Sequence, residues 1–160
     1  MAILHSVKIN NFRGIKEFKH DFYKKSLVCL VGRGDSGKTT ILDAISFVLS
    51  SSWNINFYDS DFYKNDIEKP IEIIATLIDI PESLLKGKYG FQIRGFSKES
   101  GLIEDELGAD SEPAISIKLY VDSELEPNWT IINDRKEPIH ITASARAKLN
   151  SFLISDYTNN

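Results

Sequence analysis

The sequence predicts a mixed α/β fold in which a short strand–loop–helix unit is joined to an antiparallel β lobe. A run of apolar residues at 27–31 is followed by a glycine-rich loop and then by an apolar helical pattern. On both sides of this unit, apolar and polar residues alternate as in strands with one solvated face. The 160 residues suit a single domain. We therefore expect one domain, 1–160, with the strand–loop–helix unit within 1–50, a loop at 51–70 and the β lobe at 71–160.

The composition is that of an ordinary globular protein and excludes several functional classes. Hydrophobic residues make up 42% of the chain and charged residues 26%, with a formal net charge of −4. That charge gives no overall basic field, which argues against nucleic-acid binding by this segment but leaves a local basic patch open. Cys29 is the single cysteine, which excludes an internal disulfide framework. No apolar run reaches transmembrane length and no signal peptide is evident, so we expect a cytoplasmic protein without a membrane partner.

Two alternating stretches open the chain. The first begins at Ile3, with Val7 and Ile9 at apolar positions, and it predicts a half-buried strand. The turn sequence "NFRG" at 11–14 separates it from a second stretch, "IKEFKHDF". We expect the two strands to pair across that turn.

The next stretch, "LVCLV" at 27–31, has no polar position and predicts a strand that is buried on both faces. A loop follows at 32–39. Residues 39–50 then place apolar side chains at helical spacing, with only a narrow polar stripe that includes Asp43. A helix of this kind is expected to pack on more than one side.

The remaining chain is rich in strand patterns and poor in helix patterns. Its expected strands lie at 71–80, 89–96, 114–122 and 128–134, and the last two are expected to form an antiparallel hairpin. The sequence "ESLL" predicts one helical turn, and the acidic segment 99–112 predicts a solvated loop. A short helix is expected from Thr142, with Ala145, Leu149 and Phe152 on one face.

The loop after the apolar run matches the phosphate-binding pattern G-x-x-x-x-G-K-[ST] in full. Glycines allow the backbone to wrap closely, so that successive amides form a concave site at the positive end of the next helix. We therefore expect a nucleotide-binding P-loop, against a smaller chance of an ordinary glycine-rich turn. Its residues are Gly32, Arg33, Gly34, Asp35, Ser36, Gly37, Lys38 and Thr39.

Three residues of this unit have specific expected roles toward ATP and Mg²⁺. Lys38 is expected to contact the β and γ phosphates and the charge of the transition state. The Thr39 hydroxyl is placed to bind Mg²⁺, and Thr40 is expected to face the α phosphate. Nothing local selects adenine over guanine, and no N/T-K-x-D guanine motif follows.

A P-loop ATPase also needs an acidic residue at the end of a second buried strand. The run "IIATLID" ends at Asp79 in this manner, which leaves open a compact, self-contained NTPase or small-molecule kinase. The alternative is that the catalytic acid lies beyond Asn160. The antiparallel character of both ends of the chain favours this second interpretation, because a compact kinase would alternate strand and helix.

Three segments together resemble a known family. The strand "VKINNFRGIKEF", followed at this distance by "LVCLVGRGDSGKTTILDAI", resembles the start of RecF-like and SMC-like ABC ATPases. The segment "FYDSDFYKNDIEKPIEIIATLIDI" is similar to the OLD family (overcoming lysogenization defect), which includes Gabija-type defence ATPases. The resemblance covers about the first 80 residues well and the remainder only in kind. It implies a P-loop NTPase of ABC type, of which this chain is the N-terminal lobe.

The resemblance also implies partners and further site residues. Such ATPase heads form head-to-tail dimers that hold ATP between the P-loop of one head and the signature motif of the other, and a C-terminal Toprim domain cuts nucleic acid. The resemblance thus implies nucleic-acid contacts through regions outside these residues. Arg13 is then expected near the nucleotide, and Asp61 near Mg²⁺. Without the resemblance, Arg13 is a solvated turn residue and Asp61 a solvated loop acid. Asp79 is not catalytic in this interpretation.

The sequence departs from that family by ending early. No signature motif, second acidic motif, histidine switch or Toprim cluster is evident. We therefore expect the ATP-binding lobe of an OLD-type ATPase and nuclease, active in anti-phage defence or DNA processing, which hydrolyses ATP poorly as this segment alone. A third possibility is a nucleotide-sensing or dimerisation module without catalysis.

Overall fold

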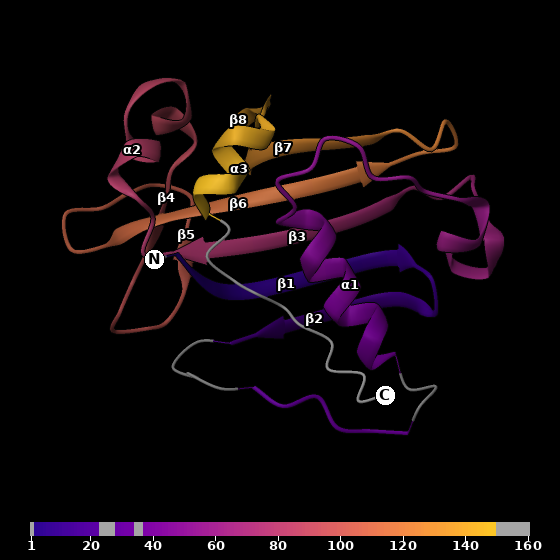
Figure 1. The fold of residues 1–160 in the computed structure, drawn as a ribbon. Coiled ribbons are helices and arrows are strands. Elements are labelled where there is room, and N and C mark those ends of the chain that lie inside the picture. Colours follow the sequence, from indigo (N-terminus) through magenta and orange to yellow (C-terminus); the bar gives the residue numbers. More distant parts are fainter. Residues whose placement is uncertain (1, 23–27, 34–36, 150–160) are drawn as a thin grey trace.

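The computed structural model describes residues 2–22, 28–33 and 37–149, and these residues form eight strands, three α-helices and three 3₁₀ turns (Figure 1). The elements in chain order are β1 (Ile3–Phe12), β2 (Ile15–Asp21), α1 (Lys38–Val48), η1 (Asp59–Asp61), η2 (Tyr63–Asn65), β3 (Ile71–Ile78), α2 (Glu82–Leu85), η3 (Gly87–Gln92), β4 (Arg94–Phe96), β5 (Ile103–Glu104), β6 (Glu112–Val121), β7 (Pro127–Asn133), β8 (Lys136–His140) and α3 (Ala143–Leu149). The predicted mixed α/β class is confirmed.

All strand pairs among these elements are antiparallel and belong to one sheet, with the order β2-β1-β3-β6-β4-β5. The long strand β6 also pairs with β7, and β7 pairs with β8. Antiparallel partners that stand directly opposite share one face of the sheet. One such row crosses five strands through Phe18, Ile9, Ile73, Leu119 and Trp129. This row forms the centre of the core.

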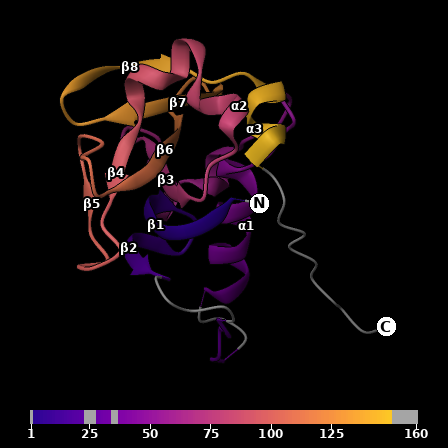
Figure 2. The same ribbon diagram turned by 90° about the vertical axis from the view of Figure 1, so that its left-hand side faces the viewer.

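Helix α1 covers that face of the sheet, and α3 lies on the same side (Figure 2). The helical spacing of the apolar residues of α1 brings Ala44, Ile45 and Val48 into the core. In β3 the strand period of two buries Ile71 and Ile73 against the helix. The apolar face of the helix and the apolar face of the sheet therefore pack together in a single layer, as the two sequence patterns predict.

The carboxyl end of α1 is held by two side chains from distant segments. The Trp129 indole Nε1 donates to the Phe47 carbonyl at 3.1 Å. Arg146, of which only 1% is exposed, donates to the carbonyls of Ser50 (2.7 Å), Ser52 (3.0 Å) and Ile141 (2.8 Å). Its guanidinium also lies 4.0 Å from the Trp129 ring centroid. Trp129 thus adds a donor to a carbonyl in the last turn of α1, where helical partners run out, and Arg146 binds carbonyls of the segment that follows the helix and the carbonyl of Ile141.

The expected strand at 27–31 is wrong for the part of it that the structure describes. Residues 28–31 lie outside any strand, and Val31 is 91% exposed while Val28 is 36% exposed. Leu27 lies outside the described residues. A strand buried on both faces needs hydrogen-bonded neighbours and a covering layer on each side. No strand among the described residues pairs with this segment, so its apolar side chains remain at the surface.

Most of the remaining elements agree with the sequence patterns, and two segments differ, namely 89–96 and the expected loop 99–112, which contains strand β5 paired with β4. The helix expected at 39–50 is present as α1, and the strands expected at 71–80, 114–122 and 128–134 are β3, β6 and β7. The strand expected at 89–96 is wrong over its first half, which forms the 3₁₀ turn η3. There the side-chain Nε2 of buried Gln92 donates to the Glu137 carbonyl at 2.6 Å.

The structure also adds an edge strand that no alternation indicated. Strand β8 pairs only with β7 and contains Pro138. Proline is tolerated at a sheet edge because no neighbour needs its missing amide hydrogen. The expected helix from Thr142 is present as α3, with Ala145 and Leu149 buried, while Phe152 lies outside the described residues.

Candidate nucleotide site

Helix α1 begins directly at the lysine of the P-loop. Gly37 precedes it with φ 83°, a left-handed conformation that disfavours side chains with a Cβ. Among the described residues, no side chain caps this end of the helix, and the first turn of α1 contains no acidic residue. Helix-start amides without a capping side chain or a carboxylate in the first turn form the arrangement that receives an anion.

The Lys38 side chain turns back over the loop that precedes it. Its ammonium donates to the Gly32 carbonyl and, at 2.6 Å, to the Arg33 carbonyl. Both carbonyls belong to the first two residues of the phosphate-binding pattern, so the lysine charge lies beside the start of the loop. Thr39 is exposed at the start of the helix and Thr40 is half-buried. The predicted residues Gly34, Asp35 and Ser36 lie outside the described residues.

Arg13, predicted to lie near the nucleotide, makes an ion pair with Asp43 of α1 and a second one with Asp61 at 3.0 Å. Burial lowers the pKa of Arg13, but the hydrogen bonds and charges of Asp61 and Asp43 outweigh it, so the pKa is raised. The guanidinium also lies 4.8 Å from the Phe12 ring centroid and 5.7 Å from that of Phe47. Arg13 is therefore firmly held at the side of α1, and is not a solvated turn residue.

Asp61, predicted to approach Mg²⁺, is 8% exposed and has a partner on each carboxylate oxygen. Oδ1 accepts from Arg13, and Oδ2 accepts from the Tyr58 amide at 2.9 Å. In the described part of the chain, no group of three or more histidine, cysteine or acidic side chains is placed to hold a metal ion. Asp61 is thus a buried hydrogen-bonded acid rather than a solvated one.

Asp43 was not singled out from the sequence as a site residue. It appeared only as part of the polar stripe on an otherwise apolar helix. A signal was nevertheless present, because Asp43 lies four residues after Thr39 and therefore on the same helix face. Sequence reasoning could use a pattern of two features: an acidic residue four positions after the P-loop threonine, and an arginine in the turn between the first two strands.

Asp79 lies far from this group of residues. Strand β3 starts beside the Arg13 turn, because Glu72 is opposite Asn10, and it ends at Ile78 opposite Ile3. Eight residues of strand separate the two ends by about 25 Å. Asp79 follows that distant end, with φ 56°, whereas Gly37 lies beside Ile15 at the near end. The geometry therefore disfavours Asp79 as an acid acting on a nucleotide held by the P-loop.

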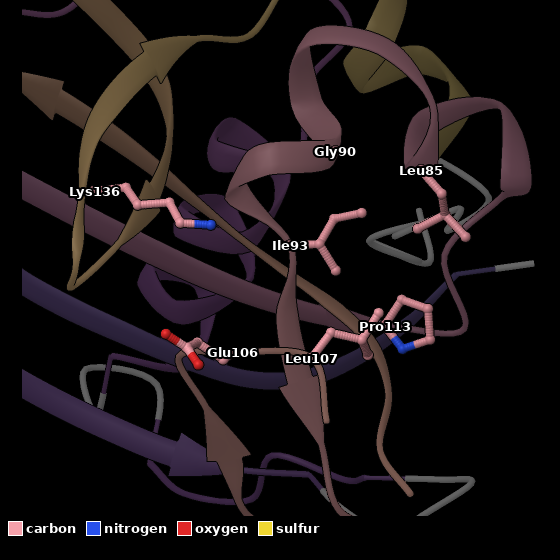
Figure 3. Close-up of a pocket in the computed structure, with 7 residues that line it drawn as sticks. All are labelled: Leu85, Gly90, Ile93, Glu106, Leu107, Pro113 and Lys136. Atoms are coloured by element: carbon pink, nitrogen blue, oxygen red, sulfur yellow. The ribbon is translucent and has the colours of Figure 1, made fainter. Parts of the chain in front are cut away.

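A cavity of about 370 Å³ lies at the same distant end of the sheet (Figure 3). Its walls come from α2, η3, β6, β8 and the neighbouring loops, and its lining residues are Leu85, Gly90, Ile93, Glu106, Leu107, Pro113 and Lys136. The Lys136 ammonium donates to the Phe91 carbonyl. Most of the lining is apolar and the cavity includes no P-loop residue, so it is separate from the phosphate site.

Residues 1–155 match the family model described as AAA ATPase domain. The chain belongs to that family, and membership implies ATP binding. The helices of the described residues include none that is long and apolar enough to cross a membrane.

Two known proteins are similar to this chain. Endonuclease GajA of Bacillus cereus (strain VD045) is 36% identical over 73 residues, which span 45% of this chain and 12% of that protein. A solved structure from work on "ATP-driven dimerization and DNA stimulated activation of SMC ATPases" has a TM-score of 0.53 and 16% identity, and covers 91% of this chain and 75% of that one. These matches confirm the resemblance to OLD-like and SMC-like ATPases, the second at the level of fold alone.

Proposed function

We propose that this domain binds ATP through its P-loop as the N-terminal, ATP-binding lobe of an ABC-type, OLD-family ATP-dependent endonuclease or ATPase. The uncapped start of α1 behind left-handed Gly37 carries the proposal, since it offers amides and a positive helix end to phosphate. The expected ligands are residues 32–40, with Lys38 at the β and γ phosphates. A role in DNA processing is supported by the similarity to the endonuclease GajA, and a role in anti-phage defence by the resemblance of the sequence to the OLD family.

The chemistry of the helix start also suits Mg²⁺. Thr39 presents an exposed hydroxyl beside the expected phosphates, and an oxygen donor with phosphate oxygens is what Mg²⁺ prefers. Asp61 remains a second candidate, although each of its oxygens already accepts a hydrogen bond, from Arg13 and from the Tyr58 amide, so that a metal contact would use a remaining lone pair or displace one donor. Measuring ATP affinity across a Mg²⁺ titration tests this role. An Asp61→Asn variant that loses affinity only when Mg²⁺ is present would favour a metal contact.

The partners follow from the relatives and are proposals for this chain. The work on SMC ATPases describes ATP-driven dimerisation, and a similar fold supports a homodimer formed through the ATPase heads. Endonuclease activity is proposed only for a protein in which this domain is joined to further regions, because the chain spans 12% of GajA. Sedimentation of this chain with and without a non-hydrolysable ATP analogue tests the dimer, and an unchanged monomer would argue against it.

Lys38 gives the direct test of nucleotide binding. We expect Lys38→Ala to weaken the affinity for ATPγS at least about tenfold in titration calorimetry, since it removes the ammonium that is expected to contact the β and γ phosphates. The matched control is Lys148→Ala, which removes an exposed lysine on α3. Equal affinities for wild type and Lys38→Ala would reject the P-loop assignment.

A further inference from the structure

Three charged side chains join three segments at the side of α1. Arg13 comes from the turn between β1 and β2, Asp43 from the middle of α1, and Asp61 from η1. Arg13 Nη1 donates to Asp43 and Arg13 Nε donates to Asp61 at 3.0 Å. We call these three residues the Arg13 clamp.

The turn that carries Arg13 is already fixed to the η1 segment by its backbone. The Arg13 amide donates to the Asp61 carbonyl at 2.7 Å, and Phe12 forms an isolated bridge with Phe62. The Asn11 side chain adds a bond to the Pro70 carbonyl at 3.2 Å. The Arg13 guanidinium is therefore not needed to attach the turn to η1. What it adds is the connection from these two segments to α1.

The turn holds Arg13 in an unfavourable backbone conformation. Its φ is 50°, and that of Asn11 is 56°, so two residues with side chains lie in the left-handed region within three positions. Such conformations persist where the surrounding contacts over-determine them, and they gather at sites with a function. Here the contacts are the two carboxylates and the Phe12 ring.

The clamp is partly screened from water and contains one positive charge against two negative charges. The exposed fraction of the side chain is 33% for Arg13, 36% for Asp43 and 11% for Asp61. One guanidinium serves two carboxylates, so removing either acid leaves the other pair intact, while removing Arg13 leaves two acids without a cation. The three substitutions therefore have distinguishable consequences.

Asp43 places the contact between the Arg13 clamp and α1 near the end of the helix that is expected to bind phosphate. Asp43 is the only acidic residue of this helix, and it lies one turn after Thr39 on the same face. A turn of helix is about 5.4 Å long. The point at which Arg13 holds α1 is thus about one turn from the amides that are expected to receive phosphate.

We propose that Asp43 is a positioning residue of the nucleotide site, which acts through Arg13. Together, Asp43 and Asp61 hold the guanidinium, and the clamp sets the position of the first turns of α1 relative to the β1–β2 turn and η1. Asp61 then serves the site as a clamp residue. The part of this inference that concerns nucleotide rests on the proposed function, whereas the mechanical part does not.

Nucleotide affinity tests whether Asp43 acts through Arg13. We expect Asp43→Asn to weaken ATPγS binding about three- to tenfold, and Asp43→Glu to restore it to within about twofold because the charge returns. In an Arg13→Gln background, Asp43→Asn should change the affinity by less than about twofold. Independent, multiplying effects of the two substitutions would overturn the proposal, as would an unchanged affinity in Asp43→Asn.

Hydrogen exchange tests the mechanical part whether or not nucleotide binds. Asp43→Asn should speed amide exchange in α1 while β3 keeps its wild-type rate, because only the attachment of the helix is loosened. The matched control is Asp66→Asn, which removes an acid paired with Lys69 at 3.2 Å outside α1. Unchanged exchange in α1, or equally faster exchange in β3, would reject the clamp. If wild type fails to bind ATPγS but α1 exchange responds, the proposed function fails and the clamp stands.

Discussion

Replacing Arg146 by methionine probes how the end of α1 is joined to α3. The guanidinium is buried, donates to three backbone carbonyls and has no carboxylate partner among the described residues. Burial lowers the pKa of Arg146, which reflects the cost of holding this charge away from water. Methionine keeps the packing stem and removes every hydrogen bond. The variant thus measures the value of those bonds together with the guanidinium contact to the Trp129 ring.

The magnitude follows from which carbonyls can regain water. Ser52 is exposed, so its carbonyl is rehydrated at little cost, while the Ile141 and Ser50 carbonyls stay buried or half-buried. A buried acceptor that loses its donor costs about 1–3 kcal/mol. Two such acceptors, less the relief of removing a buried charge, give a loss of about 2–4 kcal/mol in the free energy of unfolding.

Urea unfolding followed by tryptophan fluorescence measures this loss. Trp129 is 3% exposed and touches Arg146, whereas Trp53 is 79% exposed, so a Trp53→Phe background isolates the informative signal. The control is Arg135→Met, which removes an exposed arginine that pairs with Glu106 at 2.9 Å. Exposed pairs contribute about 0–1 kcal/mol. The reasoning is refuted if Arg146→Met costs no more than Arg135→Met, or if it stabilises the protein.

Four further substitutions have clear expected outcomes. Gly95→Ala places a Cβ 2.4 Å from the Glu106 carbonyl oxygen and should cost at least about 2 kcal/mol in urea unfolding, whereas Gly14→Ala meets nothing within 4 Å and should be tolerated. Gly37→Ala forces a side chain into the left-handed region and should lower stability by about 1–2 kcal/mol in thermal unfolding, with weaker ATPγS binding. Asp79→Asn should leave ATPγS affinity and any ATPase turnover within about twofold of wild type, given its distance from the P-loop; a strong loss of turnover would revive the compact NTPase.

The sequence predicts strands and helices correctly where the regular spacing of apolar side chains matches the face that is buried. In β3 and β6, alternation placed every second residue in the core, and in α1 the helical period did the same. The edge strand β8 and the 3₁₀ turn η3 escaped prediction because neither buries a periodic face. Their structures depend on partners far away in sequence, namely β7 and the Glu137 carbonyl.

The P-loop was predictable for a different reason. Its glycines, Lys38 and Thr39 act through the local backbone, so consecutive residues carry the whole pattern. The start of α1 at Lys38 and the left-handed Gly37 agree with that prediction. The roles proposed for the individual residues toward ATP and Mg²⁺ stay predictions.

The sequence by itself determined the alternating strands, the apolar helix and the phosphate-binding loop, because each rests on contacts between near neighbours in the chain. Tertiary structure alone decided the rest of the site. It placed Arg13 between Asp43 and Asp61, 30 and 48 residues away, and it left the apolar segment 28–31 exposed without a neighbouring strand. The physical reason is that an ion pair or a buried strand needs a partner, and only the folded chain selects which partner comes within reach.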